Sequence, residues 1–496
     1  MSEKHPQPAI KSYYFDQGYK DLKSILSTAW QNNATTASTM GTRISATWQT
    51  GGKVRILICL CYVIATISMY LFGTIFFGII AAVHVLVLMM IMLVVYIGCL
   101  IIALLDRLYL SIKKISVDCT NCHKRFLYPV YICPECGAKH DKLTPGAYGI
   151  MHRRCECGAK LPTSFLNVKF KRKQLESECP YCGTSLNAKE TRPMTIPVVG
   201  GASVGKTAFI NAFAIQFVEE VALDKDFEVD MYNDENMSEY NMRKKEVNHG
   251  LVTKTPVVTD ITKPSSIAFS FFLKHEGMDP DRLVHIYDIA GETFSENAEN
   301  ELQKQYEHCD GIVMMIDPFS IPSVNARYES EMDAADIASI SAIRIDDVLD
   351  SFLNKLQQIT GLSENKLTNN PIAIVINKVD VVDLDNIIGD SAIQQAMKDD
   401  SGHFNDYYNT MDYLCKKFLL ENDMGDVVQN IQMKFKQYRF FSCSAMGHTI
   451  GKGRYYPKGV LPVMEWIIAQ NDKKLYSYWN ETQFPTKTYT FSLTEE

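Results

Sequence analysis

Residues 194–207 read MTIPVVGGASVGKT, and this stretch decides the fold. An apolar run from Met194 to Val199 precedes the loop, and a helix-like stretch from Ala208 to Val218 follows it. Glycines in such a loop let backbone N–H groups turn inward around phosphate, while the lysine reaches the β and γ phosphates and the threonine hydroxyl faces Mg²⁺. The stretch therefore predicts a phosphate-binding loop between a strand and a helix. The residues expected to bind here are Gly200, Ser203, Gly205, Lys206, Thr207 and Ala208.

Two later motifs also follow strand-like runs. Leu283 to Tyr287 leads into DIAG, where the Asp288 carboxylate can hold Mg²⁺ through water and the Gly291 N–H can meet a γ-phosphate. The run PIAIVINKVD ends with Asn377, Lys378 and Asp380. A carboxylate such as Asp380 can accept hydrogen bonds from N1 and N2 of guanine, whereas adenine offers no such donor pair. This motif favours a guanine nucleotide over adenine.

A fourth motif, SCSA, follows the strand-like run from Tyr438 to Ser442. A backbone N–H at Ser444 or Ala445 can donate to O6 of guanine. Order, spacing and strand context of the four motifs therefore agree with one nucleotide site.

With GGASVGKT, DIAG, NKVD and SCSA in this order, residues 190–470 resemble the Ras-like (TRAFAC-class) P-loop GTPases. The resemblance implies an α/β fold with a mostly parallel sheet between helices, Mg²⁺-dependent GTP binding and two switch segments. The region is longer than a minimal domain of this class, so we expect insertions around 220–250, 320–365 and 390–430. The combination with the membrane and cysteine-rich segments described below is similar to bacterial multidomain GTPases.

Two positions depart from the family pattern. Glu292 stands where many members place the Gln that orients the attacking water, so hydrolysis is expected to be slow or to need a partner. The switch threonine is expected before residue 265, and Thr255 is favoured there as a magnesium ligand beside Thr207 and Asp288. Its competitors are Thr253, Thr259 and Thr262. The resemblance assigns the catalytic roles to Lys206, Gly291 and Glu292, and no arginine finger can be assigned.

From Ile56 to Leu105 there are 50 residues without Asp, Glu, Lys or Arg. A bilayer crossing needs about 20 residues, so the run predicts two transmembrane helices, 56–76 and 81–105, joined by a turn. Lys53 and Arg55 precede the run, and basic residues follow it, so both flanks are expected on the cytoplasmic side. A buried hairpin in a soluble core is the alternative.

Eight cysteines form four close pairs, which favours metal over disulfides. Two thiolates on one turn and two on another complete a tetrahedral zinc site with no open position, so two structural zinc ions are expected. Pairing in sequence order is predicted, and a cross-braced arrangement of first with third and second with fourth pair is the alternative. The expected ligands are Cys119, Cys122, Cys133, Cys136, Cys155, Cys157, Cys179 and Cys182.

Composition bounds the remaining choices. The length of 496 residues excludes a single ordinary domain. The hydrophobic share of 46%, with a net charge of only −7, excludes a disordered chain. Residues 107–192 contain 16 Lys and Arg against seven Asp and Glu, so this segment is basic. Anionic lipid or protein contact is favoured for it, and nucleic-acid binding is the alternative. We expect an N-terminal segment with an amphipathic helix at 1–52 and a transmembrane hairpin at 53–107. A zinc-ribbon region at 116–190, a GTPase domain at 191–475 and a tail at 476–496 should follow.

These features predict a membrane-anchored GTPase switch that signals to a protein partner, with its soluble parts in the cytoplasm and its hairpin in a bacterial inner membrane. The alternative is a membrane adaptor whose zinc ribbons recognise protein or nucleic acid and whose nucleotide turns over inefficiently. The expected cofactors are GTP, Mg²⁺ and two Zn²⁺.

Overall fold

The structure is a computed structural model that describes residues 8–164, 172–187, 190–248, 267–288, 308–332, 334–360, 368–447 and 455–485. The chain divides into two compact units. The first unit comprises residues 1–114 and 128–189, and the second comprises 115–127 and 190–496. Residues 116–127, which were predicted to be part of the zinc-ribbon region, thus belong to the second unit.

The second unit is built on a seven-stranded sheet whose spatial order is β11-β12-β13-β10-β14-β15-β16 in the described residues. β10 pairs in parallel with β13 and β14, and β15 and β16 extend the parallel part, whereas β11 and β12 add an antiparallel edge. The strands are β10 (Arg192–Val199), β11 (Glu228–Met231), β12 (Ile267–Lys274), β13 (Arg282–Asp288), β14 (Ile312–Ile316), β15 (Ile372–Ile376) and β16 (Tyr438–Ser442).

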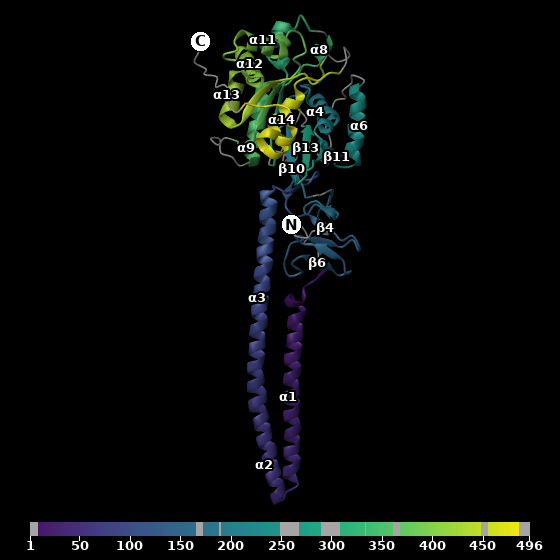
Figure 1. Ribbon diagram of the computed structural model, residues 1–496, viewed down its shortest axis with the longest axis vertical. Coiled ribbons are helices and arrows are strands. Elements are labelled where there is room, and N and C mark those ends of the chain that lie inside the picture. The colour runs from purple at the N-terminus through teal and green to yellow at the C-terminus, as the bar shows by residue number, and fades with distance from the viewer. Residues whose placement is uncertain are drawn as a thin grey trace. The chain divides into compact units, whose positions relative to one another are not determined.

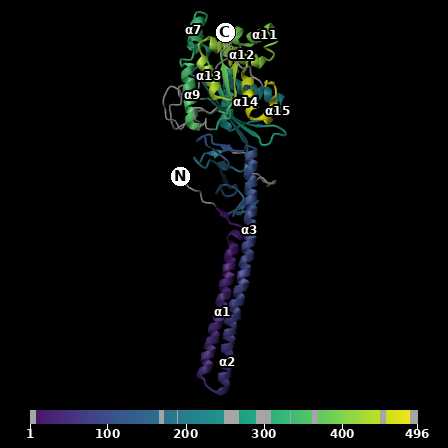
Figure 2. The same cartoon turned by 90° about the vertical axis from the view of Figure 1, so that its left-hand side faces the viewer.

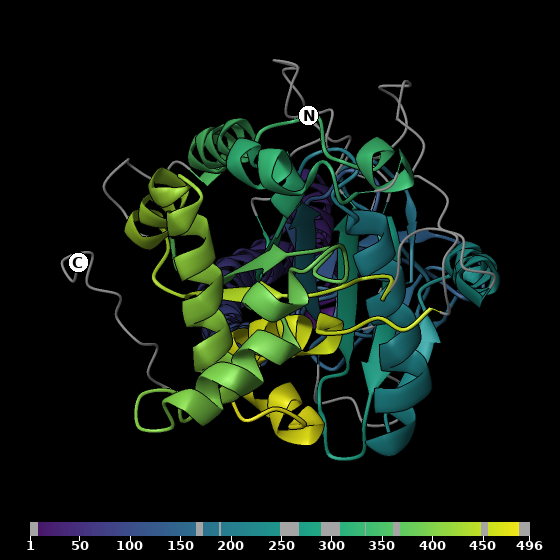
Figure 3. The same cartoon turned by 90° about the horizontal axis from the view of Figure 1, so that it is seen from above.

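The parallel strands read as continuous apolar runs because helices cover both faces of a parallel sheet. All five residues of β14 (IVMMI) and of β15 (IAIVI) are buried. Figure 3 shows helices on both sides of the sheet, and α4 and α14 pack against each other. The mostly parallel α/β sheet predicted from the motif series is present in the described residues.

The helices of the second unit include those at the three expected insertions, namely α5 and α6, α7 to α9, and α11 to α13 (Figure 1). They are α4 (Lys206–Gln216), η4 (Phe217–Val221), α5 (Ala222–Asp224), α6 (Asp234–Asn248), η7 (Pro318–Ser320), α7 (Pro322–Tyr328), α8 (Ala334–Ala338), α9 (Ile345–Thr360), α10 (Asp385–Ile388), α11 (Asp390–Asp399), α12 (Tyr407–Glu421), α13 (Gly425–Lys434), α14 (Val460–Asn471) and α15 (Lys473–Trp479).

The first unit differs from the predicted transmembrane hairpin. α2 (Lys53–Ser68), the π-helical turn η2 (Met69–Thr74) and α3 (Ile75–Ile112) form one continuous helix, so the turn predicted between 76 and 81 is wrong. The glycines near this point serve close packing instead of a turn. A Cβ on Gly73 would lie 3.0 Å from Asn33 Oδ1, and one on Gly78 would lie 4.0 Å from Trp30.

The chain reverses before the apolar helix. η1 (Tyr13–Phe15) and α1 (Gln17–Gln49) precede it, and Gly51 and Gly52 turn the chain with φ of +61° and +106°. α1 then runs antiparallel beside α2 and η2 (Figures 1 and 2), with Trp30 and Phe77 in edge contact at 5.6 Å. The helical hairpin is therefore formed by a polar and an apolar helix.

The rest of the first unit is a set of short hairpins. A three-stranded sheet has the order β1-β6-β7, and a four-stranded sheet has the order β5-β4-β8-β9. Their elements are β1 (Ala9–Ile10), β4 (Val130–Ile132), β5 (Lys139–Asp141), β6 (His152–Cys155), β7 (Lys160–Pro162), η3 (Arg172–Gln174), β8 (Ser177–Glu178) and β9 (Ser185–Leu186).

Within the first unit, a buried ion pair joins the end of α3 to the ribbon segment. Arg172 donates from two nitrogens to the two carboxylate oxygens of Asp106, both at 2.9 Å, and Tyr128 donates to the same carboxylate at 3.0 Å. Both charged side chains are at most 1% exposed. The charges satisfy each other where water does not reach them.

Candidate functional site

The phosphate-binding loop joins the buried strand β10 to α4. Gly205 has a φ of +94°, and a Cβ there would lie 2.3 Å from Asn377 Nδ2. A Cβ on Gly200 would lie 2.8 Å from the Met315 carbonyl oxygen. Glycine is required at both positions because any side chain would collide. The loop therefore keeps its backbone N–H groups near the N-terminus of α4, where an anion is favoured.

Lys206 is buried, and its ammonium group donates to the carbonyl oxygens of Gly200 at 2.9 Å and Gly201 at 2.7 Å. The amine thus lies over the loop in which phosphate is expected. Thr207 donates from its hydroxyl to Asp288 Oδ2 at 2.7 Å. A hydroxyl and a carboxylate side by side at the ends of α4 and β13 are oxygen ligands of the kind that Mg²⁺ prefers, so these residues fit a magnesium ion.

The loop after β15 is fastened to the phosphate-binding loop by one side chain. Asn377 Nδ2 donates to the Val204 carbonyl oxygen at 2.8 Å. Its Oδ1 accepts from the Ala445 backbone N–H at 3.1 Å and from the Cys443 thiol at 3.4 Å. Asn377 therefore holds together three loops that lie far apart in the sequence.

Asp380 lies beside Ser444, whose hydroxyl donates to its carboxylate; this hydroxyl in turn accepts from the Gly447 backbone N–H at 2.8 Å. Both residues line a cavity of about 420 Å³ that also includes Tyr407 and Lys458. The structure thus places a carboxylate and the SCSA turn at one opening, as recognition of the Watson–Crick edge of guanine requires.

Asp317 is a further residue of the site that none of the four sequence motifs contains. Asp317 directly follows β14, is fully buried, and accepts from the Lys378 ammonium group and the Ser341 backbone N–H at 2.7 and 3.0 Å. Lys378 also donates to the Ser339 carbonyl oxygen at 2.7 Å, and its φ is +60°. Asp317 therefore fixes the lysine of the NKVD motif. Its signal was an acid at the carboxyl end of an apolar parallel strand.

Several expected residues lie outside the described part of the chain. These are Thr253, Thr255, Thr259, Thr262, Gly291 and Glu292. The described nucleotide-site residues therefore comprise the phosphate-binding loop, Asp288, and the NKVD and SCSA motifs. We call the SCSA motif, residues 442–445, the base-side turn.

Two groups of four cysteines could hold a metal ion among the described residues, and in each group the sulfur atoms lie within 4.8 Å of one another. One group is Cys133, Cys136, Cys155 and Cys157, and the other is Cys119, Cys122, Cys179 and Cys182. The predicted sequential pairing is wrong, and so is the cross-braced alternative. The second and third pairs form one group, and the first and fourth pairs form the other.

The geometry of the first group fits zinc. The Cys133 and Cys157 sulfurs are 3.7 Å apart, and those of Cys136 and Cys155 are 3.6 Å apart. Tetrahedral zinc with bonds of about 2.3 Å places its sulfurs about 3.8 Å apart. We call each turn that carries a cysteine pair a knuckle. Gly137 follows the knuckle of Cys133 and Cys136 with a φ of +70°, which lets the turn close.

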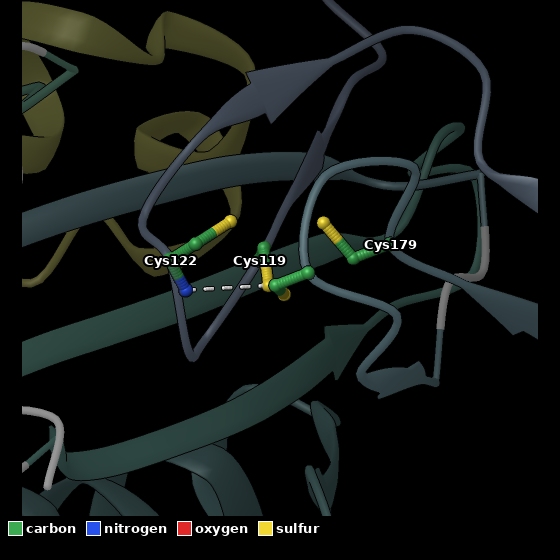
Figure 4. A group of neighbouring side chains, drawn as sticks. Cys119, Cys122 and Cys179 are labelled. Carbon is green, nitrogen blue, oxygen red and sulfur yellow. Dashed lines mark hydrogen bonds between the residues drawn. The ribbon is translucent and has the colours of Figure 1, made fainter. Parts of the chain in front are cut away.

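The other two knuckles show backbone donors aimed at sulfur. The Cys122 N–H donates to Cys119 Sγ at 3.5 Å (Figure 4). The Tyr181 N–H donates to Cys179 Sγ at 3.4 Å. Such donors stabilise thiolate charge, so both turns suit metal-bound cysteine.

Comparisons with known proteins bear on the second unit. Two solved structures, the S. cerevisiae Ski7 GTPase-like domain bound to GDP and inorganic phosphate and sup35 complexed with GMPPNP, are 12% and 13% identical to this chain, with TM-scores of 0.25 and 0.19. The matches cover 57% and 54% of this chain, and they span about half or less of those chains, 50% and 40%. The search of curated proteins found no match.

A family model described as Double-GTPase 2 matches residues 194–411. The matched range contains the phosphate-binding loop, Asp288 and the NKVD motif, whose contacts are described above. GTP binding with Mg²⁺ is implied by this match. The motif contacts, the fold of the second unit and this match together support a P-loop GTPase domain over residues 194–411.

Proposed function

We propose that this protein is a membrane-anchored GTP-binding switch that hydrolyses GTP and signals to a protein partner at the membrane. The observation that carries the proposal is the position of Asn377. Its amide joins the Val204 carbonyl of the phosphate-binding loop to the Ala445 N–H of the base-side turn. A single nucleotide can therefore contact both loops, and its binding couples them.

Each described residue has a role in this proposal. Lys206 would exchange its two carbonyl partners for phosphate oxygens, and Thr207 and Asp288 would hold Mg²⁺. The ion supplies positive charge that neutralises the β and γ phosphates. Gly291, Glu292 and Thr255 are proposed to contact the γ-phosphate, the attacking water and the ion. Because a negative charge at Glu292 would repel the γ-phosphate, turnover is proposed to be slow without a partner.

The proposal assigns base selection to Asp380. Two charge-assisted hydrogen bonds from guanine would contribute at most about 1.5 to 3 kcal/mol each, once the bound base covers this exposed carboxylate. Ser444 donates to the same carboxylate and so holds it in place. Adenine cannot make either bond, which favours GTP over ATP.

Membrane anchoring is proposed through the helix at residues 53–112. Among the described residues this is the one helix long and apolar enough to cross a membrane; 6% of its most apolar window is buried, and that window has a mean hydropathy of 3.1. Its 60 residues extend about 90 Å, whereas a bilayer core is about 30 Å thick. One crossing thus needs only part of the helix.

α1 can accompany this helix into the bilayer. Between Lys23 and Arg43 it carries no charged residue, and hydroxyls such as those of Thr35 and Thr39 donate to carbonyl oxygens four residues earlier at 2.8 and 2.9 Å. A polar side chain satisfied by its own helix costs less in lipid. Resistance to extraction by alkaline carbonate tests the proposal, and release of the intact chain by carbonate would contradict it.

The partner is proposed to be a protein, with the basic ribbon segment contacting it or anionic lipid. The adaptor alternative keeps the same nucleotide site with inefficient turnover. Phosphate release from the full-length protein in nanodiscs, with GTP and then with ATP, separates the two. Release of phosphate from GTP in excess over protein supports the switch, and a single equivalent or none supports the adaptor.

Base selectivity tests the proposal directly. Asp380→Asn should weaken GTP binding and raise the affinity for xanthosine triphosphate, whose extra carbonyl matches an amide donor. Lys206→Ala should abolish binding of both nucleotides. Asp385→Asn is a matched control, because Asp385 lines the same cavity outside the NKVD motif. Fluorescent GTP, XTP and ATP analogues provide the titration. Equal affinity of the wild type for ATP and GTP would remove the guanine assignment.

A further inference from the structure

The hairpin formed by β2 (Val117–Asp118) and β3 (Arg125–Phe126) contains the Cys119–Cys122 knuckle and packs within the GTPase unit. Ser116 bridges to Thr191, the residue that precedes β10. β2 then contacts β10 itself. This knuckle therefore adjoins the strand that leads into the phosphate-binding loop.

A half-buried polar cluster fastens the hairpin to the sheet. Arg125 donates to both carboxylate oxygens of Asp118 at 2.7 and 2.8 Å and reaches Asp310 at 3.5 Å. Thr195 of β10 donates from its hydroxyl to Asp118 at 3.3 Å and from its backbone N–H to Asp310 at 2.9 Å. These contacts hold the base of the hairpin on β10. The turn that contains Cys119 and Cys122 extends beyond them.

One ring extends this contact to the magnesium side of the site. His123 follows Cys122, and its ring meets the buried ring of Tyr287 edge-on, with centroids 5.6 Å apart. Tyr287 immediately precedes Asp288, whose carboxylate accepts from Thr207 at 2.7 Å. Neither ring nitrogen of His123 has a hydrogen-bond partner in the described part of the chain, so the contact is one of ring packing.

We propose that His123 is a positioning residue through which the metal site containing Cys119 and Cys122 and the Mg²⁺·GTP site influence each other's affinity. The inference rests on the proposed function, because it assumes that the site binds Mg²⁺·GTP. A metal ion bound by Cys119 and Cys122 fixes the turn that holds His123 on Tyr287. That contact fixes the end of β13, where Asp288 must face Thr207 to hold the ion.

Coupling between two sites is reciprocal. If zinc strengthens nucleotide binding by some factor, the nucleotide strengthens zinc binding by the same factor, and such factors commonly lie between about 5 and 150. Packing of one ring pair belongs at the lower end of this range. We therefore expect about a tenfold effect in each direction.

The experiment uses full-length protein in nanodiscs with zinc bound. His123→Ala removes the ring, His123→Phe retains a ring that needs no hydrogen bond, and His152→Ala is a control at an exposed histidine. The affinity for a fluorescent GTP analogue is measured with Mg²⁺ and with EDTA. Zinc content is measured by elemental analysis, and zinc release to a chromogenic chelator is timed with and without Mg²⁺·GTPγS.

His123→Ala should keep its zinc, bind Mg²⁺·GTP about tenfold more weakly, and lose the protection of zinc by nucleotide. The difference from wild type should vanish in EDTA, because the effect passes through the magnesium ligand Asp288. His123→Phe should restore wild-type values. Loss of one zinc in both His123 variants would instead make His123 a metal ligand and overturn the proposal.

The two proposals fail in different ways. Failure of the wild type to bind GTP would remove the proposed function. Binding of GTP by wild type and His123→Ala with equal affinity, together with zinc release that nucleotide does not change, would leave the function standing and remove the coupling.

Discussion

Replacing Asn377 with alanine should separate the loops of the nucleotide site. The side chain is buried, with 3% exposure, and it donates at 2.8 Å to the Val204 carbonyl and accepts at 3.1 Å from the Ala445 N–H. Alanine leaves both backbone groups without these partners. Each buried, unsatisfied group costs about 1 to 3 kcal/mol, so the free energy of unfolding should fall by about 2 to 6 kcal/mol. Water entering the gap would bring the loss toward the lower value.

The same change should weaken GTP binding. Without Asn377 the base-side turn is no longer fixed to the phosphate-binding loop, so the nucleotide must order both loops when it binds. We expect the Kd for GTP to rise at least about tenfold, which corresponds to about 1.4 kcal/mol. Titration with a fluorescent GTP analogue measures the affinity, and thermal unfolding without nucleotide measures the stability.

Asn370→Ala is the matched control. Asn370 precedes β15, at the opposite end of the strand from Asn377, and its side chain donates to the Cys309 carbonyl oxygen at 2.9 Å. Its loss should lower stability by about 1 kcal/mol and leave the GTP affinity unchanged. Equal GTP affinities for the two alanine variants would refute the assignment of Asn377 as the residue that joins the loops.

Three further changes test other parts of the molecule. Elemental analysis should find two zinc ions per chain, and Cys133→Ser and Cys119→Ser should each lose one; a single zinc in the wild type would contradict the two-site assignment. Asp106→Ala should destabilise the first unit by about 3 to 5 kcal/mol because it leaves Arg172 buried without its partner carboxylate, measurable by thermal unfolding in nanodiscs. Burial lowers the pKa of His285 from 6.5 to about 4, so the unfolded chain binds the extra proton in that window and stability should fall as the pH drops from 6.5 to 4. His285→Gln should flatten this pH dependence, and an unchanged profile would argue against a buried neutral imidazole.

The nucleotide-site residues were predictable because each motif is local. A strand that ends in a glycine-rich loop and a helix places Gly205 and Lys206 through its own backbone geometry. The chain order of the motifs then indicated that Asp288, Asn377 and Asp380 follow parallel strands, whose carboxyl ends meet at one edge of a sheet. Asp317 has the same position after β14, but it lacked a motif that would distinguish it from other acids.

The membrane segment shows where a local pattern misleads. Fifty residues without charge predict burial in lipid or protein, and their number predicted two spans with a turn between residues 76 and 81. Gly73 and Gly78 lie near this point. In the structure these glycines lie against Asn33 and Trp30 of α1, so their missing side chains allow close packing. The sequence alone does not tell a glycine that forms a turn from a glycine that allows two helices to pack closely. The position of the neighbouring helix decides between the two.

By itself the sequence determined which residues form knuckles, loops and strands, because these depend on side chains a few positions apart. Only the tertiary structure decided which knuckles share a metal site and that residues 115–127 pack on β10. Those choices depend on contacts between segments distant in sequence, such as Asp118 with Thr195 and Cys136 with Cys155. Cysteine spacing carries no information about them, because any two knuckles supply the same four thiolates.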